Sequence, residues 1–199
     1  MLRTHVDDPR VLAAIRDVPR DVFVPARLRE EAWDNVALPI GSGQTISQPL
    51  VVARMCELLA LTGEERVLDV GTGSGYQAAV LAELAGEVDT IERIPELAVS
   101  ARAALVEAGY ESVRVHVGDG TLGVPEHAPY TAIAVAAAAP EIPPALYEQL
   151  EPRGRLVVPI GRLRGQELHV VVRSPEGPAV VHSVPCRFVP LVGEGGFPE

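Results

Sequence analysis

Residues 69–75 read Asp-Val-Gly-Thr-Gly-Ser-Gly and form the strongest chemical signal in this 199-residue chain. Glycine lets a backbone approach a ligand closely, and free amides at the start of a following helix can donate hydrogen bonds to it. The dinucleotide fingerprint G-x-G-x-x-G does not fit, because Tyr76 stands where its last glycine would be. The segment therefore predicts a turn that binds a cofactor other than a dinucleotide; the alternative is a tight turn without a ligand.

Two more acidic residues follow this segment at positions that suit a nucleoside. Glu92 lies about 20 residues further on, where a carboxylate can accept hydrogen bonds from both ribose hydroxyls. Asp119, between two glycines, could accept a hydrogen bond from an adenine amino group. The alternatives are a solvent-exposed charge for Glu92 and, for Asp119, a turn residue that bonds its own backbone.

Several kinds of chemistry are disfavoured by the residue types present. The chain has no Lys, so lysine Schiff-base chemistry and the phosphate-binding lysine of Walker-type sites are excluded. Cys56 and Cys186 are too few for a disulfide framework or a cysteine zinc site, and we expect buried thiols in a reducing compartment. The five histidines show no paired spacing, so no metal site is predicted, and His116 and His127 are interpreted as structural or surface residues.

Charge and hydropathy narrow the class of partner. The 27 acidic and 17 basic residues give a net charge of −10, which disfavours nucleic acid because phosphate backbones need a basic surface. Hydrophobic residues make up 47% and charged residues 22%, typical of a globular protein. No apolar run resembles a signal peptide or reaches the ~18 residues of a membrane span. We therefore expect a cytoplasmic protein without membrane contact.

The elements that must position these residues follow a regular order after residue 65. Strands and helices alternate, which predicts an α/β fold: a doubly wound, mostly parallel, Rossmann-like sheet with helices on both faces. The expected strands are residues 66–70, 87–92, 113–117, 132–136 and 154–159, with two more at 167–173 and 180–189. The expected helices are residues 76–84, 95–107 and 144–150.

Residues 1–65 are helical in pattern and precede this core within a single domain, 1–199. A short helix is predicted from Pro9, and apolar residues at helical spacing predict another just after Pro49. Between them, residues 38–49 are rich in turn formers and are expected to form a loop. The core with its C-terminal strands spans 66–199, and residues 193–199 are expected to fray.

The loop 38–49 reads Leu-Pro-Ile-Gly-Ser-Gly-Gln-Thr-Ile-Ser-Gln-Pro and closely resembles the signature loop of the protein-L-isoaspartate O-methyltransferase family. The D-x-G-x-G-x-G spacing of residues 69–75 also resembles motif I of methyltransferases that depend on S-adenosylmethionine. Further resemblance to the family lies at residues 67–79, 92–97, 118–120, 138–143 and 187–191. It covers nearly the whole chain, from about Val18 to Leu191.

This resemblance implies an enzyme, a protein-L-isoaspartate(D-aspartate) O-methyltransferase, that methylates the free carboxylate of L-isoaspartyl residues in damaged proteins and peptides. The methyl donor is S-adenosyl-L-methionine, and S-adenosyl-L-homocysteine is the product. The methyl ester closes spontaneously to a succinimide, and hydrolysis returns some normal aspartate. A monomer with neither nucleic-acid nor membrane partners is expected. The residues expected to bind the cofactor are Asp69, Gly71, Thr72, Gly73, Ser74, Gly75, Glu92, Asp119 and Gly120.

The resemblance marks Ser47 as catalytic, and Ile40, Thr45 and Ile46 are expected to shape the substrate pocket. A carboxylate with a pKa near ~4 is already ionised at neutral pH, so this acceptor needs no general base. The protein has mainly to align a carboxylate oxygen with the methyl group, which can supply about 7–11 kcal/mol. The alternative for Ser47 is an ordinary N-cap of the helix that follows.

Two positions depart from the family's usual pattern. Thr131 stands where an Asp commonly precedes the fourth core strand, and Ala136 where a Thr commonly follows it, so a hydroxyl near the methyl-transfer site is lost.

Two other functions remain open. One alternative is a methyltransferase of the same fold that acts on an aspartate of a biosynthetic peptide. The other is a non-catalytic relative that binds the cofactor without turnover.

Overall fold

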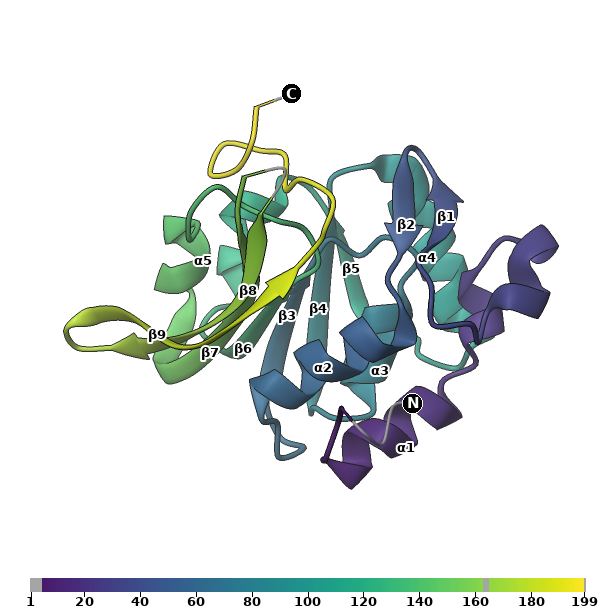
Figure 1. The fold of residues 1–199 in the computed structure, drawn as a ribbon, viewed down its shortest axis with the longest axis horizontal. Coiled ribbons are helices and arrows are strands. Elements are labelled where there is room, and N and C mark those ends of the chain that lie inside the picture. Colours follow the sequence, from purple (N-terminus) through teal and green to yellow (C-terminus); the bar gives the residue numbers. More distant parts are fainter. Residues whose placement is uncertain (1–4, 163–164, 199) are drawn as a thin grey trace.

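A seven-stranded sheet organises the chain in a computed structural model that describes residues 5–162 and 165–198 (Figure 1). Its strand order is β5-β4-β3-β6-β7-β8-β9. The strands are β3 (Arg66–Val70), β4 (Glu87–Glu92), β5 (Arg114–Val117), β6 (Tyr130–Val135), β7 (Leu150–Gly161), β8 (Gln166–Ser174) and β9 (Gly177–Cys186). The pairs from β5 to β7 are parallel and the last two pairs are antiparallel, so the predicted mostly parallel sheet is confirmed.

The central strands are buried on both faces, as expected of a parallel sheet covered by helices. Successive residues of a strand point to opposite faces, and on β3 Val67 and Leu68 belong to two different apolar clusters. On β6, Ala132 and Ile133 divide in the same way. The continuous apolar runs in the sequence therefore reflect two cores, one on each side of the sheet.

Helices cover these two faces. They are α1 (Pro9–Asp17), α2 (Pro49–Leu59), α3 (Tyr76–Ala82), α4 (Pro95–Glu107) and α5 (Pro144–Glu148). Figure 1 shows α2 and α3 across one face, and their buried residues share a cluster with Val67, whereas Leu146 of α5 packs in the other cluster. Short 3₁₀ helices complete the set: η2 (Arg20–Phe23), η3 (Ala26–Glu31), η4 (Gly120–Leu122) and η5 (Pro125–His127). None of the helices within the described ranges has the length and apolarity that a membrane crossing requires.

The predicted loop at residues 38–49 is wrong in part, because it contains a β-hairpin. Strands β1 (Leu38–Gly41) and β2 (Gln44–Ile46) pair antiparallel with each other. The turn residues that suggested a loop make the hairpin possible, because Gly41, Ser42 and Gly43 all have positive φ, which a tight hairpin turn requires. The region before the sheet is therefore only partly helical.

The prediction that residues 193–199 fray is also wrong for the part that the structure describes, which ends at residue 198. The Gly193 amide donates to the Phe197 carbonyl at 3.1 Å, and the Phe197 amide donates to the Leu191 carbonyl at 2.7 Å. The Glu194 amide donates to the Asp119 carboxylate at 2.8 Å. These bonds hold the C-terminal segment against the loop that follows β5.

Candidate active site

A pocket opens where β3, β4 and β6 end, at the edge where open α/β sheets bind ligands. Hairpin β1–β2 and the C-terminal segment both stand at this edge, at the top of the sheet in Figure 1. The predicted site residues that line the pocket are Thr45, Ile46, Ser47, Gly71, Thr72, Gly73, Ser74, Glu92 and Gly120. Those outside its lining are Ile40, Asp69, Gly75 and Asp119.

The turn between β3 and α3 depends on its glycines. Gly71 has φ +91° and Gly75, the N-cap of α3, has φ +92°, a left-handed conformation that disfavours other residues. A Cβ on Gly75 would also lie 3.3 Å from Leu105 Cγ, so glycine lets α3 and α4 approach each other. The turn thus brings the backbone of residues 71–74 to the pocket surface.

Glu92 is buried, with 7% of its surface exposed, so its alternative as a solvent-exposed charge is wrong. Its Oε2 accepts a hydrogen bond from the Gly73 amide at 2.8 Å, and its Oε1 accepts one from the Ile94 amide at 2.9 Å. Each carboxylate oxygen can accept about two hydrogen bonds, so both retain acceptor capacity for a ligand. Glu92 therefore fixes the glycine turn and can still bind two hydroxyls.

Asp69 supports the turn from below, outside the pocket lining. Its side chain is fully buried; Gln77 Nε2 donates to Oδ1 at 2.8 Å, and Thr90 Oγ1 donates to Oδ2 at 2.9 Å. The Thr90 hydroxyl lies 2.7 Å from that of Thr72, which lines the pocket. Burial raises the pKa of Asp69 to about 7 although the bonds from Gln77 and Thr90 lower it, and the charge of Glu92 raises it further. The structure thus makes Asp69 a neighbour of the glycine turn rather than part of the pocket wall.

Asp119 uses its carboxylate within the protein. Oδ1 accepts hydrogen bonds from the amide of Thr121 at 2.9 Å and from its hydroxyl at 2.7 Å. This is the geometry expected if Asp119 is a turn residue that bonds the nearby backbone, which was the alternative interpretation. Oδ2 accepts from the Glu194 amide at 2.8 Å. Gly120, the next residue, does line the pocket, and a Cβ there would lie only 2.7 Å from Val70 Cγ1. Binding of adenine by Asp119 stays a prediction.

Ser47 lies between β2 and α2, half-buried at the pocket wall. Its alternative as an N-cap is wrong, because Gln48 is the N-cap of α2 and the amide of Leu50, in the first turn, donates to Asn35 Oδ1 at 3.1 Å. Ile40, from β1, packs behind the glycine turn, where a Cβ on Gly73 would lie 3.4 Å from its Cδ1. The hairpin therefore joins the predicted substrate residues to the predicted cofactor turn.

One wall of the pocket was not foreseen as part of the site. Residues 189–192, which follow β9, line it beside Ala136 and Ala137. This segment is held at the sheet edge because the Ala138 amide donates to the Val189 carbonyl at 2.8 Å and the Leu191 amide donates to the Ala138 carbonyl at 2.7 Å. The sequence signal for it was the motif at residues 187–191.

Comparisons with known proteins agree on one family. The family model described as "Protein-L-isoaspartate(D-aspartate) O-methyltransferase" matches residues 2–196. Protein-L-isoaspartate O-methyltransferase 1 of Anaeromyxobacter sp. (strain Fw109-5) is 57% identical, over 96% of this chain and 92% of the relative. Protein-L-isoaspartate O-methyltransferase of Methanoculleus marisnigri is 51% identical, over 96% of this chain and 87% of the relative.

Solved structures show the same fold. A protein-L-isoaspartate O-methyltransferase structure superposes with a TM-score of 0.87 at 27% identity; it matches 98% of this chain, which spans 64% of that longer protein. A Plasmodium falciparum protein solved with S-adenosyl-L-homocysteine superposes with a TM-score of 0.83 at 23% identity, over 96% of this chain and 93% of that one. The second likeness supports the fold alone.

Proposed function

The chain belongs to the protein-L-isoaspartate(D-aspartate) O-methyltransferase family, and we propose that it methylates the free carboxylate of L-isoaspartyl residues in damaged proteins and peptides. It is an enzyme, and its cofactor is S-adenosyl-L-methionine. The observation that carries the assignment of its site is that one pocket joins the glycine turn and Glu92 to Ser47 of the hairpin region.

The residues present fit this cofactor. The backbone of the glycine turn lies open to the pocket, and Glu92 offers two carboxylate oxygens with free acceptor capacity, the acceptors that the two ribose hydroxyls require. When bound, S-adenosyl-L-methionine supplies an electrophilic methyl group on a positively charged sulfur. Gly71, Gly73 and Glu92 would hold it, with Thr72 positioned through Thr90 and Asp69.

The chain's part in the reaction is to bind and orient the substrate carboxylate. That group is ionised at neutral pH and needs no base to remove a proton. Ser47 and Thr45 line the same pocket as the glycine turn, so their hydroxyls could donate hydrogen bonds to the carboxylate, and Ile46 is buried next to them. Alignment of the reacting atoms and exclusion of water then lower the barrier.

A methyl-transfer assay with matched peptides tests this proposal. We expect methylation of an isoaspartyl peptide and little of the same peptide with a normal aspartyl residue. The reverse preference would favour the biosynthetic-peptide alternative. Binding of S-adenosyl-L-homocysteine without methylation of either peptide would favour the non-catalytic alternative.

Substitution of Ser47 should reduce catalysis more than stability. We expect Ser47→Ala to lower kcat/KM for the isoaspartyl peptide at least about tenfold, near 1.4 kcal/mol, because its hydroxyl holds the carboxylate in line with the methyl group. Ser47→Cys keeps the size but donates a much weaker hydrogen bond, so it should also be impaired. Steady-state methylation measures both, with calorimetry of S-adenosyl-L-homocysteine to check that cofactor affinity is unchanged.

A matched control is Ser100→Ala, which removes a hydroxyl that donates to the Glu96 carbonyl on α4, outside the pocket. It should leave turnover as in the wild type. Full activity in both Ser47 variants would contradict the catalytic role.

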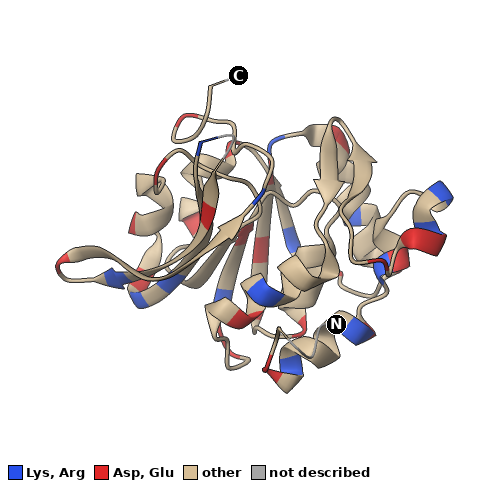
Figure 2. Ribbon diagram, in the orientation of Figure 1, with Lys and Arg blue, Asp and Glu red and all other residues tan. Residues whose placement is uncertain are grey.

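We propose a monomeric chain in a reducing, cytoplasmic compartment. Cys56 and Cys186 are free thiols, and burial raises the pKa of both, which keeps them in the unreactive protonated form. Figure 2 shows Arg interspersed with Asp and Glu over many elements rather than gathered along one, in keeping with a partner that is not nucleic acid. Sedimentation analysis would test the monomer, and a stable dimer would contradict it.

A further inference from the structure

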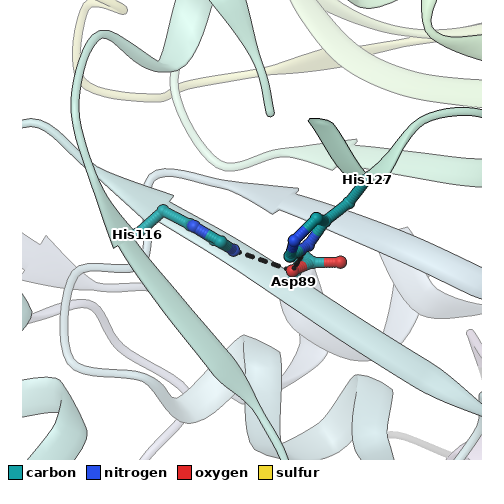
Figure 3. A group of neighbouring side chains, drawn as sticks. All are labelled: Asp89, His116 and His127. Atoms are coloured by element: carbon teal, nitrogen blue, oxygen red, sulfur yellow. Dashed lines mark hydrogen bonds and ion pairs between the residues drawn. The ribbon is translucent and has the colours of Figure 1, made fainter. Parts of the chain in front are cut away.

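Asp89, His116 and His127 converge away from the pocket, and none of them lines it (Figure 3). They come from β4, β5 and η5 in turn. Asp89 is fully buried, while the side chains of His116 and His127 are 28% and 35% exposed. The cluster thus consists of one buried carboxylate and two partly solvent-exposed imidazoles.

The ligand atoms of this cluster are close together. His116 Nε2 and His127 Nδ1 each lie 2.7 Å from Asp89 Oδ1, and all three atoms lie within 4.8 Å of one another. The two rings are nearly perpendicular, at 79°, with centroids 5.1 Å apart. Each ring therefore points one nitrogen at a common position.

Asp89 Oδ1 is crowded by nitrogen atoms. Besides the two imidazole nitrogens, Arg114 Nε donates to it at 2.9 Å. A carboxylate oxygen has about two acceptor sites, fewer than the three nitrogens around this one. One cation shared by Oδ1 and both imidazoles would relieve this competition, because the rings would then act as acceptors rather than donors.

Arg114 is the group that competes with a cation, and it has other partners. Its Nη2 donates to Asp89 Oδ2 at 2.9 Å and to Glu87 Oε2 at 2.8 Å. Arg114 can keep both of these bonds while Asp89 Oδ1 binds a metal ion. A hydrogen bond from Arg114 to Oδ2 would then orient the ligating carboxylate.

We propose that Asp89, His116 and His127 form a Zn²⁺ site, with water as a fourth ligand on the exposed side. Two imidazoles and a carboxylate suit zinc, whereas calcium and magnesium prefer oxygen ligands alone. Tetrahedral zinc with bonds of about 2.0–2.1 Å separates its ligand atoms by about 3.3 Å. Each imidazole nitrogen, now 2.7 Å from Oδ1, has to move to about that distance from it, and the two nitrogens, now within 4.8 Å of each other, have to reach the same spacing. The ion ties β4, β5 and η5 together and stabilises the fold, without a part in methyl transfer.

Calorimetric titration of the untagged, chelator-treated chain with ZnCl₂ tests the site. We expect one Zn²⁺ per chain, a higher melting temperature with the ion, and visible absorption bands of tetrahedral Co²⁺ when CoCl₂ replaces it. His116→Gln and His127→Gln should each weaken Zn²⁺ binding at least about tenfold, since even loss of an outer hydrogen-bond partner costs that much. The double variant should lose the Co²⁺ bands.

The matched control is His169→Gln, which alters a different His–carboxylate pair, with Glu167 at 3.4 Å, and should leave Zn²⁺ affinity unchanged. Equal affinity in the wild type and the double variant would place the ion elsewhere on the chain and overturn the proposal. So would the absence of Zn²⁺ binding by the wild type, which would leave the cluster as a hydrogen-bond network alone. Affinity for S-adenosyl-L-homocysteine should be the same in every variant, which separates this test from that of the proposed function.

Discussion

Glu92→Ala should weaken binding of S-adenosyl-L-homocysteine by about 1.5–3 kcal/mol, or roughly 10- to 150-fold, the range for hydrogen bonds to a charged group. Two effects combine, because the carboxylate that would accept the ribose hydroxyls also holds the Gly73 amide and hence the glycine turn. The dissociation constant is measured by calorimetry, alongside NAD, for which we expect no binding by the wild type.

The control for this prediction is Glu96→Ala, on the exposed side of the first turn of α4 and outside the pocket. It removes the same charge near the site without touching the turn, so it should change affinity little. An unchanged dissociation constant in Glu92→Ala would contradict the role of Glu92 in cofactor binding. Thermal melts of both variants show how much of the loss comes from a destabilised turn.

The parallel core could be predicted from sequence because its signals are local. Strands β3 and β4 and helix α4 have the bounds that the sequence indicated, Arg66–Val70, Glu87–Glu92 and Pro95–Glu107. β3 is a short, mostly apolar run, both strands are buried on both faces after their first residue, and α4 begins with a proline, which suits the first position of a helix. Signals of this kind need no knowledge of distant contacts.

Hairpin β1–β2 lacked such a signal. Its strands have only four and three residues, and one of them contains Pro39, which is untypical of a strand interior. So short a pattern cannot be told from a turn-rich loop. The pairing of Leu38 with Ile46, both buried, becomes visible only when the chain folds back on itself.

The Asp89 cluster was hidden for a different reason. His116 and His127 lie 27 and 38 residues from Asp89 along the chain, so the three residues do not form a local motif. They meet because β5 pairs in parallel with β4, which puts His116 opposite Ile91, on the same face of the sheet as Asp89 two residues earlier. Helix η5 then brings His127 to the same place. Spacing in sequence does not report such contacts, so the histidines carried no signal before the strand register was known.

The sequence motif around Asp119 indicates where this residue lies but does not indicate which groups its carboxylate bonds. The residue lies two positions after the end of β5, next to Gly120 of the pocket lining. Its carboxylate is nevertheless bonded to Thr121 and to the C-terminal segment, 75 residues away. The C-terminal segment that was expected to fray is held in part by that acid, a long-range contact that local pattern could not reveal.

Asp69→Asn should change how stability depends on pH. The pKa of buried Asp69 is raised to about 7, whereas an unfolded chain has an ordinary aspartate near ~3.9. Between these values the folded chain holds a proton that the unfolded chain has lost, so the free energy of unfolding falls by about 1.4 kcal/mol per pH unit as pH rises. The stabilising contribution of the protonated acid is full below the unfolded pKa and is lost by the time pH passes the folded pKa.

Asparagine can replace the protonated acid in this environment. Its Oδ1 can accept from Gln77 Nε2, and its Nδ2 can donate to the Thr90 hydroxyl, which then donates to Thr72. We therefore expect Asp69→Asn to fold and, relative to the wild type, to gain about 2–3 kcal/mol of stability between about pH 5 and about pH 7. Urea unfolding of both chains at the two pH values measures this difference, and the contributions of other titrating groups cancel in it.

Asp34→Asn serves as the control, because it makes the same substitution at an exposed position. Its stability should follow that of the wild type at both pH values. If Asp69→Asn and the wild type instead lose stability in parallel as pH rises, Asp69 is ionised in the folded chain throughout. The hydrogen bonds from Gln77 and Thr90 would then outweigh burial, and the glycine turn would rest on a buried negative charge rather than on a neutral acid.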